Sequence, residues 1–229
     1  SSLQGCPSPW SIDGTNKETE LKVVEGKALL MRLRNPRRVT DVIPKSKELS
    51  GNRVVVNWGV DETHVLKNLN INAPSPIEGK YRWTGKHRPF KHQKTTAGFL
   101  TLNKRAFCFN EQGTGKTASA IWAADFLMNQ GRIKRVLVVC PLSIMDSAWR
   151  NDLFDFAMHR KVDVAYGSAK KRAAVINSEA EFVIINYDGV EIVADEIANG
   201  GFDLIIVDEA THYKNAQTNR WKTLNKLVK

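Results

Sequence analysis

From about residue 105 onward, short apolar runs alternate with longer stretches of helical periodicity. The predicted strands are Arg105–Phe109, Arg135–Cys140, Val162–Tyr166, Phe182–Asn186 and Phe202–Val207. The predicted helices are Thr117–Asn129, Ile144–Met158, Ala169–Asn177 and Val190–Ala198, followed by one over Ala216–Val228. Unbroken runs such as VLVVC, FVIIN and LIIVD are typical of parallel strands buried on both faces. The alternation therefore predicts βαβ units and a doubly wound α/β fold.

Residues 1–78 follow a different pattern. Lys27–Leu33 and Arg53–Trp58 are predicted strands, and Thr63–Leu69 is a predicted short helix. The Pro-containing segment Ala73–Pro76 is typical of a linker. We therefore expect a small basic N-terminal domain of α+β or β-rich type over residues 1–78, linker included. The larger α/β domain is expected over residues 79–229.

Charge separates the two parts of the chain. The formal net charge is +10, and residues 1–110 carry 19 lysines and arginines against 9 acidic residues, whereas residues 111–229 carry 15 of each. A one-sided basic excess favours a polyanionic partner such as DNA. A solvated basic face gives the same count and is the alternative interpretation.

Composition narrows the class of protein. With 42% hydrophobic and 25% charged residues, the chain has the composition of a globular protein rather than a disordered one. No apolar run reaches the roughly 18 residues that a membrane-spanning helix needs. The first residues, SSLQGCPSPW, do not resemble a secretory leader. The three cysteines, Cys6, Cys108 and Cys140, show neither a disulfide framework nor metal-ligand spacing, which favours a reducing compartment.

The segment FCFNEQGTGKT connects the first predicted strand of the larger domain to its first helix. Glycines at 113 and 115 allow a tight turn, and backbone N–H groups at the start of the helix can bind phosphate oxygens. Lys116 supplies a cation for the β- and γ-phosphates, and the Thr117 hydroxyl is a Mg²⁺ ligand. The residues expected at the nucleotide are Gln112, Gly113, Thr114, Gly115, Lys116 and Thr117. Asn110 replaces the first glycine of the general phosphate-loop pattern.

A second motif follows the last predicted strand. In FDLIIVDEATHYKN, Asp208 and Glu209 come directly after a buried run, at the strand end where open α/β sheets bind ligands. Asp208 is expected to hold Mg²⁺ through water, together with Thr117. Glu209 is expected to orient or deprotonate the attacking water. The sequence therefore predicts an ATP and Mg²⁺ site with Lys116, Asp208 and Glu209 as its catalytic residues.

In this order the motifs resemble the first RecA-like lobe of a superfamily-two helicase, and most of all its Swi/Snf-related branch. The resembling segments, from about residue 86 to 229, are RPFKHQKTTAGFL, NEQGTGKT, VLVVCPLSIMDSAWRNDL, VAYGSAKKR, IINYDGV and DEATHYKN. The resemblance implies that Gln93 reads adenine and that Pro141, Ser143 and Tyr187 contact the DNA backbone. An acidic residue at 111 without glycine at 110 also fits this branch. Thr211 stands where DEAH-type boxes have histidine, with His212 one place later, so the coupling role is assigned to neither.

The resemblance implies an ATP-dependent DNA translocase or helicase that acts on duplex or branched DNA. Such a motor needs a second RecA-like lobe that supplies arginines, so we expect residues 1–229 alone to bind ATP·Mg²⁺ weakly with little turnover. The alternative is a nucleotide-dependent DNA-binding module that recognises a DNA structure without motor activity. A small-molecule P-loop kinase or transporter ATPase predicts neither Gln93 nor the segment at 141–143. The diverged motifs suggest a phage or bacterial member, hence a cytoplasmic location, or a nuclear one if the source is eukaryotic. The oligomeric state is left open.

Overall fold

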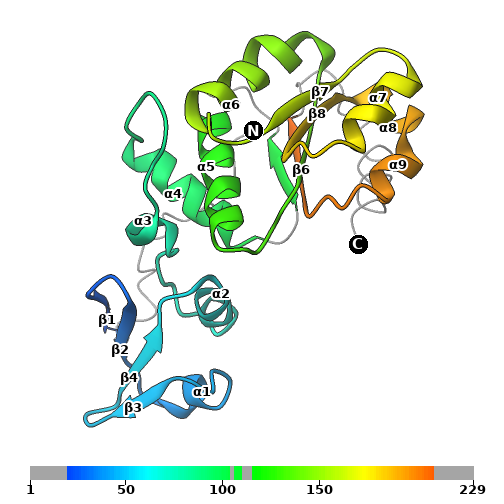
Figure 1. The fold of residues 1–229 in the computed structure, drawn as a ribbon. Coiled ribbons are helices and arrows are strands. Elements are labelled where there is room, and N and C mark those ends of the chain that lie inside the picture. Colours follow the sequence, from blue (N-terminus) through cyan, green and yellow to red (C-terminus); the bar gives the residue numbers. More distant parts are fainter. Residues whose placement is uncertain (1–19, 104–105, 110–114, 209–229) are drawn as a thin grey trace, which may run out of the picture. The chain divides into compact units, whose positions relative to one another are not determined.

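The computed structural model describes residues 20–103, 106–109 and 115–208. The chain divides into two compact units, Ser1–Arg82 and Trp83–Lys229 (Figure 1). The helix predicted over Ala216–Val228 lies outside the described residues.

The smaller unit is built on an antiparallel sheet with the strand order β1-β2-β4-β3. Its strands are β1 (Glu20–Val24), β2 (Ala28–Arg32), β3 (Lys47–Leu49) and β4 (Arg53–Asn57). The described residues of this unit also form three short helices, α1 (Arg37–Thr40), α2 (Val60–Asn68) and α3 (Ile77–Lys80). The predicted strands at 27–33 and 53–58 are the two central strands. The edge strands β1 and β3 were not predicted, because ELKVV and KEL lack an alternating apolar pattern.

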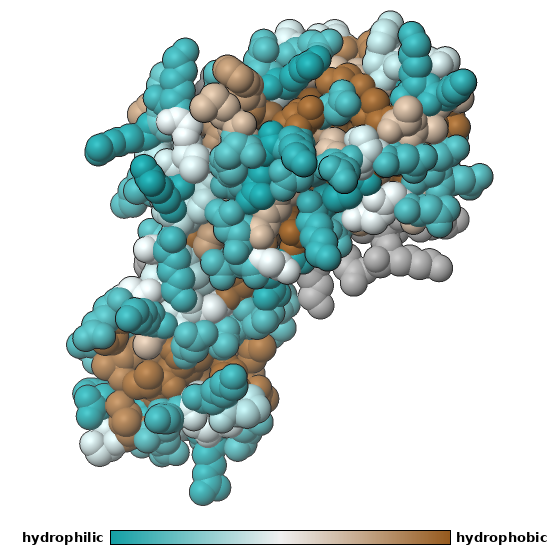
Figure 2. Space-filling model, viewed as in Figure 1, coloured by the Kyte–Doolittle hydropathy of each residue, from teal (hydrophilic) through white to brown (hydrophobic). Residues whose placement is uncertain are grey.

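Alternate residues of the two central strands form the core of the smaller unit. Leu29 and Met31 on β2 and Val54 and Val56 on β4 are fully buried or nearly so, because the pleat points them to the same face. The same cluster includes Val39 of α1, Leu66 of α2, and Ile43 and Ile71 from the connecting segments. Figure 2 shows further hydrophobic surface on this unit, in the region of β2 and β4, bordered by hydrophilic side chains.

The segment predicted as a linker is part of the packed smaller unit. Pro74, Ser75 and Pro76 are buried. The indole N–H of Trp58 donates to the Pro74 carbonyl at 2.7 Å, which satisfies a backbone acceptor that would otherwise be buried without a partner. This Pro- and Ser-containing segment is therefore an irregular but packed coil, not a flexible linker.

The larger unit contains a parallel five-stranded sheet in the order β5-β9-β6-β8-β7. Its strands are β5 (Ala106–Phe109), β6 (Val136–Cys140), β7 (Val162–Ala165), β8 (Phe182–Asn186) and β9 (Leu204–Asp208). Its α-helices are α4 (Lys91–Thr101), α5 (Lys116–Asn129), α6 (Asn151–Phe156), α7 (Ala169–Ile176), α8 (Tyr187–Ile192) and α9 (Ala194–Ala198). The predicted α/β class with a parallel sheet and a second, smaller unit is confirmed.

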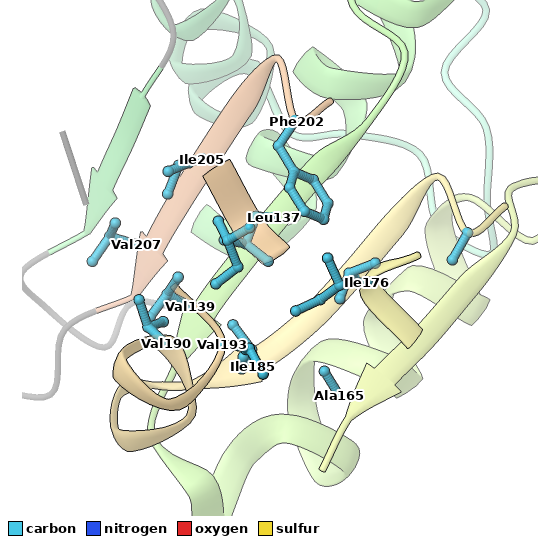
Figure 3. Packing of buried hydrophobic residues seen from close by; sticks show 13 residues of the cluster. Leu137, Val139, Ala165, Ile176, Ile185, Val190, Val193, Phe202, Ile205 and Val207 are labelled. Atoms are coloured by element: carbon cyan, nitrogen blue, oxygen red, sulfur yellow. The ribbon is translucent and has the colours of Figure 1, made fainter. Parts of the chain in front are cut away.

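Helices cover both faces of the parallel sheet (Figure 1). On one face, alternate strand residues such as Leu137, Ile185 and Ile205 pack with Val190 and Val193 from the α8–α9 segment (Figure 3). The intervening residues of the same strands point to the opposite face, as the two-residue period of a strand requires. The side chain of Asp208 belongs to that opposite set, together with Leu204 and Ile206.

Two of the predicted helices are broken in the structure. In place of one helix over 144–158, the chain forms a 3₁₀ turn (Leu142–Ile144), a π-helical turn (Met145–Arg150) and the short α6. The helix predicted at 190–198 is divided into α8 and α9 near Val193, whose φ and ψ of −122° and 33° are not helical. Helix α4 was not predicted as a helix. Among the described residues, none of the helices combines the length and apolar character needed to cross a membrane.

Candidate functional site

The predicted chemistry gathers at the carboxyl edge of the parallel sheet. Phe109, the last residue of β5, pairs with Asp208 on β9, and Cys140 at the end of β6 pairs with Asn186 of β8. The segments that follow these strands therefore begin along one edge, where open α/β sheets bind their ligands. Lys116, Pro141 and Tyr187 all belong to those segments.

The first part of the site is the start of α5. Gly115 precedes the helix with φ 93° and ψ −10°, a left-handed conformation that favours glycine. Lys116 and Thr117 form the beginning of the helix and are both half-buried. Because α5 is fourteen residues long, the N–H groups of its first turn and its dipole favour an anion there. Gln112, Gly113 and Thr114 lie outside the described residues, as does Glu209.

Gln93 is brought to the same turn by α4. Its side chain is 8% exposed, its Oε1 accepts a hydrogen bond from the Phe90 N–H at 2.8 Å, and its Nε2 lies 3.5 Å from the Gly115 carbonyl oxygen. The hydroxyl of Ser119 on α5 donates to the Gln93 carbonyl at 3.2 Å. The predicted adenine-reading residue is therefore fixed beside the start of α5. The neighbouring Phe90 ring is 69% exposed and stacks on His92.

Asp208, the predicted Mg²⁺ ligand, is half-buried and held by two aromatic side chains. The Trp149 indole N–H donates to its carboxylate Oδ2 at 2.9 Å, and the Tyr187 hydroxyl donates to its main-chain carbonyl at 2.5 Å. Burial raises the pKa of the Asp208 carboxyl, and the Trp149 hydrogen bond and the Lys116 charge act in the opposite direction. Burial and the Asp208 charge together raise the pKa of the Cys140 thiol, so this buried cysteine is a neutral core residue.

The residues predicted to contact DNA follow β6 and β8. Pro141 is half-buried and leads into the 3₁₀ turn, in which Ser143 is exposed. The Ser143 carbonyl accepts a hydrogen bond from the Ser147 hydroxyl at 3.1 Å, which ties the turn to the π-helical segment. Tyr187 is half-buried and directs its hydroxyl to Asp208. The structure thus brings Tyr187 into the acidic part of the site, a placement that its motif did not predict.

Two residues at this edge make buried hydrogen bonds that the sequence did not predict. Trp149 lies in the segment VLVVCPLSIMDSAWRNDL, to which no role in the acidic site was assigned, and its buried indole N–H donates to Asp208. The signal was available in principle, because a buried tryptophan needs an acceptor for that N–H. Arg172 lay in a basic run, AKKR, yet it is 6% exposed and donates from Nη1 to Asn186 Oδ1 at 2.7 Å. Its neighbours in sequence gave no such signal.

Solved structures define the class of fold. A SWI2/SNF2 ATPase core from Sulfolobus solfataricus, solved in complex with double-stranded DNA, matches 64% of this chain and 31% of its own chain. The TM-score is 0.53 at 22% sequence identity, so this likeness shows the fold. A second structure, of the Sulfolobus solfataricus SWI2/SNF2 ATPase core domain, matches with a TM-score of 0.50 at 21% sequence identity. The larger unit therefore has the RecA-like α/β fold of these cores.

The sequence gives the family. The chain belongs to the SNF2-related domain family, whose model matches residues 92–229. It is 32% identical over 133 residues to a putative protein, p41, of Acyrthosiphon pisum secondary endosymbiont phage 1, covering 56% of this chain and 28% of the phage protein. It is 27% identical over 120 residues to an uncharacterized ATP-dependent helicase, MG018, of Mycoplasma genitalium, covering 52% and 12% of the two chains. The chain thus spans less than a third of the length of either relative.

Proposed function

We propose that this chain is the ATP-binding lobe of an ATP-dependent DNA translocase or helicase. One observation carries the proposal. The pairing of β5 with β9 sets Phe109 opposite Asp208, and the Lys116 charge is close enough to act on the Asp208 carboxyl group. Membership of the SNF2-related family, with ATP-dependent helicases among the named relatives, supports the same function.

The residues present suit ATP and Mg²⁺. The start of α5 offers backbone N–H groups and the Lys116 ammonium to phosphate oxygens, and the left-handed Gly115 lets the turn approach them closely. Thr117 and Asp208 supply the oxygen ligands that Mg²⁺ prefers. Bound Mg²⁺ would neutralise charge on the β- and γ-phosphates. Gln93 would orient the adenine, and Glu209 would position the attacking water and accept its proton.

The DNA-facing part of the proposal uses the segments after β6 and β8. Ser143 is exposed, and Pro141 and Tyr187 directly follow Cys140 and Asn186, the last residues paired between these two strands. In this proposal they contact the DNA backbone. An arginine that stabilises the transition state is worth roughly 10³–10⁵ in rate in other NTPases. In this proposal a second RecA-like lobe supplies such arginines. We therefore expect residues 1–229 alone to bind nucleotide and to turn over little of it.

A fluorescent ATP analogue titrated in the presence of Mg²⁺ tests the proposal. Lys116→Ala should abolish binding by the 229-residue chain, because it removes the cation at the phosphates. Lys134→Ala is the matched control, since Lys134 is an exposed lysine preceding β6 at the other edge of the sheet, and it should bind as the wild type does. In a protein that includes a second lobe, Glu209→Gln should retain binding and lose hydrolysis. A wild-type chain that binds no ATP would overturn the proposed function.

The second candidate is a DNA-binding module that uses nucleotide without acting as a motor. It is favoured by the smaller unit, in which residues 20–82 carry 12 lysines and arginines against 7 acidic residues. Arg32 and Arg53 are directly paired on adjacent strands of its sheet. If the smaller unit binds DNA, replacing both with alanine should flatten the salt dependence of duplex binding by the full chain. If DNA binding needs ATP and survives this change, the motor is favoured.

A further inference from the structure

Asp208 is the last residue of β9, and the sheet holds it from one side only. On the β5 side it pairs with Phe109. On the β6 side the paired residues end with Val139 and Val207, one residue earlier. The position of Asp208 relative to β6 therefore depends on contacts other than the strand ladder.

The first of those contacts comes from the π-helical turn at Met145–Arg150. Trp149 in this turn is fully buried, and its Nε1 lies 2.9 Å from Asp208 Oδ2. A π-helical turn is wider than an α-helical one and is frequently found at functional sites. Here it carries a side chain to the metal-ligating group from the segment that begins at Pro141 and Ser143.

The second contact comes from the first residue of α8. The Tyr187 hydroxyl lies 2.5 Å from the Asp208 main-chain oxygen. Because β6 lies between β8 and β9 in the sheet, the tyrosine side chain reaches past the end of β6 to make this bond. The Tyr187 hydroxyl therefore binds the Asp208 carbonyl, one residue beyond Val207, which is the last residue of β9 that pairs with β6.

We propose that Trp149 and Tyr187 are positioning residues that fix Asp208 for Mg²⁺ and couple the DNA-facing segments to the metal site. The inference rests on the proposed function, because it takes Asp208 as a metal ligand and the segments at 141–143 and 187 as DNA contacts. Trp149 fixes one carboxylate oxygen, and Tyr187 fixes the backbone of the same residue. Movement of either segment on DNA changes the geometry at Asp208. By linkage, metal–nucleotide binding favours one arrangement of both segments to the same extent.

The test uses the 229-residue chain and a fluorescent ATP analogue, titrated once with Mg²⁺ and once with EDTA. Tyr187→Phe removes only the hydroxyl, and Trp149→Phe removes the indole N–H. Each should weaken the Mg²⁺-dependent part of binding about tenfold, as loss of an outer-shell hydrogen bond does at metal sites. Binding in EDTA should be unchanged. Trp122→Phe is the matched control, since this buried tryptophan of the same unit donates its N–H to the Thr84 carbonyl at 2.7 Å and not to Asp208.

The proposal is overturned if both variants keep the wild-type response to Mg²⁺, or if Trp122→Phe changes it equally. Should Trp149→Phe fail to fold, benzothienylalanine at 149 removes the N–H and preserves the shape. The ¹⁵N–¹H signals of the tryptophan indoles give an answer without nucleotide. Asp208→Asn and added Mn²⁺ should each perturb the Trp149 signal and leave that of Trp122 unchanged, and a Trp149 signal that ignores both overturns the positioning role. If the chain binds no nucleotide but shows these perturbations, the proposed function is refuted. The contact between Trp149 and Asp208 is then still supported.

Discussion

The side-chain amide of Gln93 lies so close to Gly115 that a Cβ at residue 115 would be 2.5 Å from its Nε2. Gly115 is required twice, since its φ of +93° also disfavours any other residue. Gly115 thus connects the start of α5, which is predicted to bind phosphate, with α4, which carries the predicted adenine contact. Because residue 115 has no side chain, the Gln93 side chain can pack directly against the turn that precedes α5.

Replacing Gly115 with alanine should therefore be more damaging than an ordinary glycine substitution. The positive φ alone costs about 1–2 kcal/mol, and the contact with Gln93 must in addition be relieved by movement of α4 or of the turn. We expect weaker ATP binding together with a lower unfolding temperature of the larger unit. Gly131→Ala is the control, because Gly131 has a φ of +70° and open space around its Cβ direction. Equal effects of the two substitutions would show that the Gln93 contact has no influence.

Arg172 provides a second prediction, on stability. Its Nη1 donates to the Ala165 carbonyl at 3.1 Å and to Asn186 Oδ1 at 2.7 Å, in surroundings that leave the side chain 6% exposed. Arg172→Met keeps the length and removes the donors, so buried acceptors lose their partner. We expect a loss of about 2–4 kcal/mol in the free energy of unfolding of the larger unit, measured by urea denaturation. Arg150→Met removes an exposed pair with Asp146 and should change it by less than about 0.5 kcal/mol.

The strands that could be predicted most directly from the sequence are those buried on both faces. The central strands β6, β8 and β9 appear as VLVVC, FVIIN and LIIVD because both of their faces are buried. The edge strand β1 could not be predicted, since four of its five residues are exposed and its pattern is set by pairing with β2 alone.

The candidate site shows the same division. The motifs predicted that Lys116 and Asp208 lie at the same edge of the parallel sheet. Each follows or ends a predicted parallel strand, and the carboxyl ends of parallel strands lie at one edge. The π-helical turn could not be predicted, because apolar periodicity does not distinguish it from an α-helix. That turn positions Trp149 on Asp208, a contact between residues 59 apart in the chain that is set by tertiary packing. The place of Gln93 against Gly115 likewise depends on how α4 packs on α5.

Asp152 predicts a pH dependence of stability. Burial and the neighbouring Asp155 charge raise its pKa to about 6 in the fold, against about 3.9 in an unfolded chain. Because the folded value is the higher one, this carboxyl favours the fold below about pH 4, and the contribution is lost as pH rises through about 6. Asp152→Asn should therefore stabilise the larger unit at pH 7.5 by about 1 kcal/mol, a value reduced for partial exposure.

The gain from Asp152→Asn should shrink towards zero by about pH 4 in urea denaturation at a series of pH values. Asp155→Asn is the companion variant. It removes the neighbouring charge and should reproduce part of the gain with the same sign of pH dependence. A gain that is constant from pH 4 to 7.5 would show that ionisation of Asp152 is not its source.

Among the substitutions proposed here, removal of the Asp125 carboxylate is expected to lower the free energy of unfolding most. Its side chain is fully buried in α5 and accepts hydrogen bonds from Arg160 Nε at 2.6 Å and from His159 Nε2 at 2.7 Å. Arg160 also binds Glu181 at 2.9 Å, so this network ties α5 to the segments before β7 and β8. Asp125→Ala leaves the arginine largely buried without its main partner, and we expect a loss of about 3–5 kcal/mol in unfolding free energy.

A double-mutant cycle separates that pair from simple loss of packing. If the charge left behind causes the damage, Arg160→Met in the Asp125→Ala background should recover part of the lost stability, because neither buried charge then remains. Glu179→Ala is the control, since its pair with Lys161 is 3.7 Å long and Glu179 is 94% exposed, and it should cost less than about 1 kcal/mol. A coupling energy near zero between Asp125 and Arg160 would mean that the network gives the larger unit no stability of its own.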